Sequence, residues 1–186
     1  MKTLPLYAGL DVHQEFTVGT VVDEMGNAVR ELKVPTNEDG YKRLFYDLQN
    51  VTAVFEAGRN WWYIASLLKP YCAFKMAHPL KVRLIASARI KTDEIDSRTL
   101  AHLLRTNLIP ESYMPPDNIV ELRNLVRYRV RLGRMAAHLK NRTHSILARE
   151  GHKSDFKPYE KKAKLWIQSL KMNPVNRDEL EYSLKL

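Results

Sequence analysis

The sequence has few of the residues that build disulfide-linked, zinc-binding or membrane-spanning proteins. Its 186 residues include a single cysteine, Cys72, which excludes an internal disulfide framework. No Cys/His cluster has the spacing of a zinc site, and no apolar run approaches the roughly 18–20 residues that a bilayer-spanning helix needs. The first five residues, Met-Lys-Thr-Leu-Pro, contain no secretory apolar region. We therefore expect a reduced, cytoplasmic protein without a membrane partner.

Positive charge is concentrated in the second half of the chain. The formal net charge is +9, and residues 119–164 alone carry 13 basic against 4 acidic side chains. Such a field attracts a polyanion, so DNA or another nucleic acid is the expected partner. Its binding should weaken steeply with added salt. The side chains expected to contact it from this region are Arg123, Arg127, Arg131, Arg134, Lys140 and Arg142.

Hydrophobic periodicity predicts an α/β domain over residues 1–108. Apolar, β-branched runs at 6–12, 16–22 and 28–34 are joined by turn residues, which predicts an antiparallel meander. Helical and strand patterns then alternate, with strands expected at 52–56 and 73–77. This order is typical of a mixed sheet with helices on its faces.

Residues 117–186 are expected to form a basic, mostly helical region after a proline-containing break at 107–116. From Asn118 to about Glu150 there is no proline and only Gly133, which predicts one helix of thirty-odd residues. An apolar residue recurs every seventh position, as in a coiled-coil seam: Leu125, Leu132, Leu139 and Ile146. We expect this helix to join copies of the chain in a homo-oligomer, although the companion seam positions are less apolar.

Four carboxylates fall where a metal-dependent nuclease would need them. Asp11 and Glu56 end apolar strand-like runs, where a carboxylate without a neutralising cation is costly. Asp93 and Asp96 lie three residues apart at the start of a helical pattern and can share a face. In a ribonuclease-H-like sheet the first and fourth strands are neighbours, which would bring Asp11 and Glu56 together. Mg²⁺ or Mn²⁺ takes such oxygen ligands, and two ions can clamp both oxygens of a phosphodiester exchange.

Neighbouring residues have a structural and a functional interpretation. Asp93 and Asp96 in a first helical turn also suit the helix dipole. Arg89 and Lys91, beside that pair, are expected to contact a phosphate. His13 could assist at the metal, although a loop histidine without such a role is the favoured interpretation. The aromatic run at 61–63 could stack on a base near the site, but core packing at a helix start is the expected role.

The motifs around these carboxylates resemble the DEDD-type transposases of bacterial insertion sequences, the insertion-sequence-one-ten family. They are Gly-Leu-Asp-Val-His at 9–13, Glu-Ala-Gly at 56–58 and Lys-Thr-Asp-x-x-Asp at 91–96. The resemblance covers that family's RuvC-like catalytic domain and the helical region after it. It implies DNA transposition or recombination that uses Mg²⁺ or Mn²⁺, and in some members guidance by a structured RNA. By this resemblance the catalytic metal ligands are Asp11, Glu56, Asp93 and Asp96.

Two departures from the family pattern bear on function. Ser97 stands where the motif commonly has a small apolar residue. The family also has a C-terminal domain with a serine nucleophile, for which no matching motif is found, so a fragment or natural truncation is expected. Two other functions stay open: a stand-alone nuclease that cleaves branched DNA, as junction resolvases do, and a non-catalytic nucleic-acid-binding module with structural acids. A kinase of related topology is disfavoured because no phosphate-binding glycine loop is present.

Overall fold

The computed structural model describes residues 4–85, 92–153 and 160–185. The chain divides into two compact units, residues 1–114 and 115–186. The predicted phosphate contacts of Arg89 and Lys91 fall outside the described residues. Within the described ranges, none of the helices combines the length and apolar character that crossing a bilayer requires.

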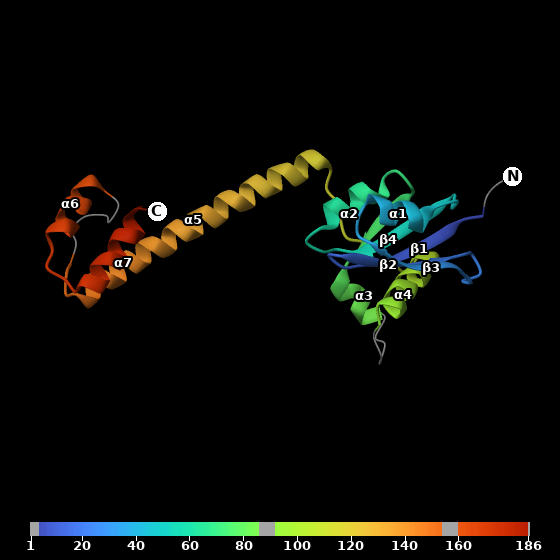
Figure 1. Ribbon diagram of the computed structural model, residues 1–186, viewed down its shortest axis with the longest axis horizontal. Helices are drawn as coiled ribbons and strands as arrows, with labels where there is room; N and C mark the ends of the chain where they lie inside the picture. Colours follow the sequence, from blue (N-terminus) through green and yellow to red (C-terminus); the bar gives the residue numbers. More distant parts are fainter. Residues whose placement is uncertain (1–3, 86–91, 154–159, 186) are drawn as a thin grey trace. The chain divides into compact units, whose positions relative to one another are not determined.

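The first unit is built on a mixed five-stranded sheet with the strand order β3-β2-β1-β4-β5. The first three strands form an antiparallel meander, and β1, β4 and β5 run parallel. Helices cover both faces of the sheet (Figure 1), which is the ribonuclease-H-like arrangement, so the predicted fold class is confirmed. The strands are β1 (Leu6–Val12), β2 (Phe16–Val22), β3 (Ala28–Pro35), β4 (Val51–Glu56) and β5 (Ala73–Ala77). The helices are α1 (Glu38–Phe45), α2 (Trp61–Leu68), α3 (Pro79–Ile85) and α4 (Asp93–Arg105).

Each face of the sheet has its own hydrophobic core. Under α1 and α2, Leu10 and Phe55 are fully buried in the larger cluster. On the opposite face, Val54 packs with α3 and α4 residues such as Leu100. Because side chains alternate between the faces of a strand, a residue that follows Leu10 or Phe55 is directed toward the α3 and α4 side. Both predicted strand-end carboxylates occupy such positions.

Helix α4 lies unusually close to the sheet because β1 has a glycine beneath it. A Cβ atom at Gly9 would lie 2.0 Å from the backbone oxygen of Ser97 and 2.4 Å from the backbone nitrogen of Ala101. The buried Ser97 hydroxyl also lies 2.8 Å from that of Thr20 on β2. The serine that departs from the family motif therefore bonds α4 to the sheet. Thr92 caps the helix by accepting a hydrogen bond from the backbone N–H of Ile95.

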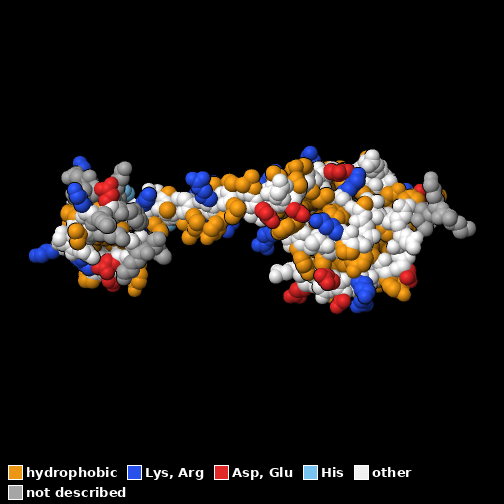
Figure 2. All heavy atoms as spheres, turned by 90° about the horizontal axis from the view of Figure 1, so that it is seen from above, with side chains coloured by type: hydrophobic (Ala, Val, Ile, Leu, Met, Phe, Trp, Pro, Cys, Tyr) orange, Lys and Arg blue, Asp and Glu red, His pale blue; other side chains and the backbone are white. Residues whose placement is uncertain are grey.

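The second unit consists of α5 (Asp117–Arg149), α6 (Lys161–Ser169) and α7 (Pro174–Lys185). The end of α5 packs in a small core that contains Ile146, Ile167 and Leu180. The last position of the predicted seam is therefore covered within the unit. Farther toward the start of α5, apolar side chains are exposed among basic ones, as the orange and blue spheres of Figure 2 show. These exposed residues are Leu122, Leu125, Val126, Tyr128, Val130, Leu132 and Met135.

Candidate metal centre

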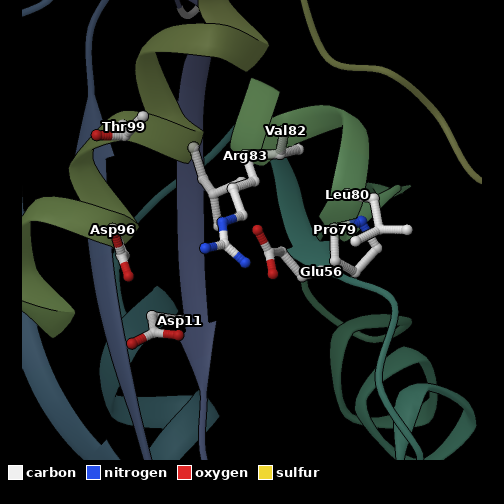
Figure 3. A pocket seen from close by; sticks show the side chains of 9 residues that line it. Asp11, Glu56, Pro79, Leu80, Val82, Arg83, Asp96 and Thr99 are labelled. Carbon is white, nitrogen blue, oxygen red and sulfur yellow. The ribbon is translucent and has the colours of Figure 1, made fainter. Parts of the chain in front are cut away.

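Three of the four predicted carboxylates line one pocket on the α3 and α4 side of the sheet. The strand register pairs Leu10 with Phe55, so Asp11 and Glu56 come next on neighbouring parallel strands. Asp96 enters the same pocket from the first turn of α4, and the cavity has a volume of about 200 Å³. Figure 3 shows the side chain of Asp96 directed toward Asp11. The topology thus gathers acids that are distant in the sequence.

The fourth carboxylate, Asp93, is not among the residues that line this pocket, but His13 lies close to both Asp93 and Asp11. The Nε2 atom of His13 lies 3.0 Å from Oδ2 of Asp11 and 3.5 Å from Oδ1 of Asp93. One side-chain oxygen or nitrogen atom from each of these three residues lies within 4.8 Å of the others. All three side chains are partly buried. The structure therefore places His13, for which the sequence favoured no role at the metal, between two predicted metal ligands.

His13 is held firmly in this position. The backbone N–H of His13 donates to the carbonyl oxygen of Phe16 at 2.9 Å. The carbonyl oxygen of His13 accepts a hydrogen bond from the hydroxyl of Thr36 at 3.0 Å. Its ring packs against that of Phe16 with centroids 4.5 Å apart. Thr36 in turn lies 2.9 Å from the buried hydroxyl of Thr17. The residue is in a loop, as expected, and its backbone is held on both sides while its ring packs against Phe16.

The electrostatics around Asp11 favour a cation. Burial raises the pKa of the Asp11 carboxyl, the bond to His13 opposes that rise, and the charges of Asp93 and Asp96 add to it. Glu56 differs from the expectation, because it ends β4 at an exposed position and its burial is therefore not what makes its charge costly. Glu56 is instead a candidate ligand because it lines the pocket together with Asp11 and Asp96.

A basic residue also enters the pocket. Arg83 on α3 lines the cavity together with Glu56 and Asp96, and Figure 3 shows its side chain pointing toward Glu56. The residue is exposed, so its guanidinium can reach an arriving ligand. Sequence analysis did not single out Arg83, since an isolated arginine on a short helix carries no motif. A guanidinium has five N–H donors and suits a phosphate group.

Further hollows adjoin the carboxylates at the carboxyl ends of β1 and β4. A cavity of about 160 Å³ shares Asp11 and Glu56 with the first and adds Asn60. The next one, about 630 Å³, shares Asn60 and adds Arg59. Of the aromatic run, Trp61 packs against the larger core as predicted, whereas Trp62 and Tyr63 are 43% and 49% exposed, so the prediction of core packing is wrong for these two. A row of adjoining hollows with an arginine at each end suits an extended polyanion.

The six basic residues predicted to bind nucleic acid from the long helix all lie on α5 and are exposed. The guanidinium of Arg142 bonds Glu179 of α7. Arg149 also approaches Glu179, at 3.4 Å. Part of the charge at the end of α5 is therefore balanced within the second unit.

The donor set of the pocket fits a hard divalent ion. Its carboxylate oxygens are the ligands that Mg²⁺ and Mn²⁺ prefer, and the partly buried Asp11 would lose an unfavourable interaction on binding a cation. In the comparison with known families, residues 8–150 match the model of a family described as a transposase, of the DEDD type of insertion sequence IS110. A comparison with curated proteins finds no match. The matched range includes all four acidic positions and α5.

Proposed function

Because this chain belongs to the IS110-type DEDD transposases, we propose that it uses Asp11, Glu56, Asp93 and Asp96 to hold Mg²⁺ or Mn²⁺ for cleavage and joining of DNA. The observation that carries the proposal is that Asp11, Glu56 and Asp96, from three separate elements, line one pocket. Asp93 shares the first turn of α4 with Asp96. When bound, the ions activate a water or hydroxyl nucleophile and stabilise the leaving oxygen.

The residues around the carboxylates suit a DNA strand. In this proposal Arg83 donates hydrogen bonds to a backbone phosphate at the pocket, which keeps the negatively charged strand beside four acids. Arg59 and Asn60 do the same in the adjoining hollow. Trp62 offers an exposed ring on which an unpaired base can stack. Such contacts place the strand without reading its sequence.

The long helix is proposed to serve both DNA and a second copy of the chain. Its exposed arginines supply a phosphate-binding surface, for which Arg127, Arg131 and Arg134 are the strongest candidates. Its exposed apolar residues, Leu125 and Leu132 among them, repeat at the spacing of a coiled-coil seam. A guide RNA, which only the family resemblance suggests, would meet the same positive charge.

The test measures Mn²⁺ binding to the full chain by isothermal titration, together with Mg²⁺- and Mn²⁺-dependent cleavage of a branched four-way DNA junction. Asp11→Asn and Asp96→Asn should abolish or strongly weaken Mn²⁺ binding. Asp47→Asn is the matched control, because Asp47 is exposed and has a φ of 61° that asparagine adopts readily. Its Mn²⁺ affinity should equal that of the wild type.

The results separate the proposal from its alternatives. Unchanged Mn²⁺ binding in both site variants would overturn the proposal and favour a non-catalytic nucleic-acid-binding module. Mn²⁺ binding that the site variants abolish, together with efficient cleavage of the junction by this chain alone, would favour the stand-alone nuclease. Mn²⁺ binding that the site variants abolish without junction cleavage supports the transposase assignment.

A further inference from the structure

We propose that His13 is a further ligand of the divalent ion, through its Nε2 atom, and that it gives the site a preference for Mn²⁺ over Mg²⁺. This inference rests on the proposed function, since it concerns an ion held by Asp11 and Asp93. The family motif assigns the four carboxylates only. In this structure the imidazole lies between two of them.

The distances around Nε2 fit a shared ion. Neighbouring ligands of an octahedral site, each about 2.1 Å from the metal, lie roughly 3 Å apart. Nε2 of His13 is 3.0 Å from Oδ2 of Asp11, which matches that separation directly. Its 3.5 Å distance to Oδ1 of Asp93 requires a shift of about half an ångström. A small side-chain rotation of Asp93, which is 42% exposed, provides that shift.

The imidazole is also preorganised for this role. Phe16 packs against the ring and accepts a hydrogen bond from the backbone of His13, while Thr36 bonds its carbonyl oxygen. Nε2 lies 3.0 Å from Oδ2 of Asp11, so an ionised Asp11 without a metal accepts a hydrogen bond from Nε2–H. As a ligand, Nε2 must offer its lone pair, with the single ring proton on Nδ1. The lone pair then faces the two carboxylates that the N–H faces here.

A nitrogen ligand changes which ion the site prefers. Carboxylate oxygens suit Mg²⁺ and Mn²⁺ alike, whereas imidazole suits transition metals. Adding one imidazole to an oxygen site therefore strengthens Mn²⁺ binding more than Mg²⁺ binding. A histidine that merely orients Asp11 by a hydrogen bond would support both ions equally. The ratio of the two affinities distinguishes these roles.

The test uses the full chain loaded with Mn²⁺ alone and pulsed electron paramagnetic resonance, which detects the ¹⁴N nucleus of a directly bound imidazole. We expect nitrogen modulation in the wild type and its loss in His13→Ala and His13→Gln. Glutamine keeps an N–H donor for Asp11 but lacks the ring nitrogen. His138→Ala is the control, because His138 is an exposed histidine on α5. In His13→Gln the Mn²⁺ affinity should fall about tenfold or more, with a smaller change for Mg²⁺.

The outcomes keep this inference separate from the proposed function. If the wild type binds Mn²⁺ without nitrogen modulation and Asp11→Asn loses that binding, the role of His13 is overturned. The proposed function then stays intact. Equal loss of Mn²⁺ and Mg²⁺ affinity in His13→Gln would also overturn it. If the wild type binds no Mn²⁺, both proposals fail. A wild-type spectrum without nitrogen modulation rules out the role of His13 even if a variant does not fold, and if His13→Ala does not fold, loss of the modulation in His13→Gln still assigns the signal.

Discussion

The substitution Gly9→Ala tests how the fold places the acids of α4 over the sheet. The added Cβ would lie 2.0 Å from a backbone oxygen of α4, and ordinary contact begins near 3.4 Å. The helix must therefore move by about 1.4 Å, because backbone atoms cannot rotate away. Overpacking of this kind costs about 1–3 kcal/mol, and loss of the buried Thr20–Ser97 hydrogen bond adds about 1 kcal/mol. We expect a total of roughly 2–4 kcal/mol.

Two measurements check this prediction, urea denaturation and Mn²⁺ titration. Because the displaced helix carries Asp93 and Asp96, Gly9→Ala should bind Mn²⁺ at least about tenfold more weakly. The variant should still fold, since domains typically have about 5–15 kcal/mol of stability. The matched control is Gly133→Ala, where a Cβ meets nothing within 4 Å in mid-helix. It should stabilise its own unit by about 0.5–1 kcal/mol without affecting Mn²⁺. A Gly9→Ala protein with wild-type stability and affinity would refute the reasoning.

Four further predictions follow from the site and the long helix. Asp11→Asn should raise the melting temperature of the metal-free protein, because the pKa of Asp11 is raised and its ionised form destabilises the fold as pH rises. With Mn²⁺ at a hundred times its Kd, the same variant should lose the roughly 2.7 kcal/mol of stability that the bound ion supplies to the wild type. Arg83→Gln should retain Mn²⁺ binding and weaken DNA binding about tenfold in fluorescence anisotropy. Replacing Arg127 and Arg131 by glutamine should reduce the slope of log K against log salt by about 2. If α5 joins copies of the chain as proposed, Leu132→Glu should convert the wild-type oligomer to monomer in sedimentation velocity runs. Unchanged values in these assays would contradict the corresponding roles.

Most of the architecture was predictable because local signals agree with the topology. β-branched runs punctuated by Asp, Asn, Gly and Pro predict the strands, and one meander followed by alternating elements determines which strands are neighbours. The approach of Asp11 to Glu56 follows from that neighbourhood. The family membership predicted from the motifs is likewise confirmed by the match over residues 8–150.

The features that were not predicted depend on the direction of side chains and on which face of each helix or strand is buried. Helix α2 is apolar on all sides, so periodicity could not tell that Ile64 is buried while Trp62 is exposed. Glu56 ends β4 at an exposed position, which the hydrophobic run before it does not reveal. The ring of His13 lies within 3.5 Å of Asp93, which is 80 residues away in the sequence. Spacing alone cannot supply such contacts.

The most direct test of the account is a crystal structure of the protein grown with Mn²⁺, with the ion located by its anomalous signal. We predict anomalous density within about 2.0–2.6 Å of carboxylate oxygens from Asp11, Glu56, Asp93 and Asp96. With His13 as a ligand, its Nε2 atom should lie at a similar distance from the ion near Asp11. Carboxylates more than roughly 10 Å apart, with no ion between them, would contradict the central claim.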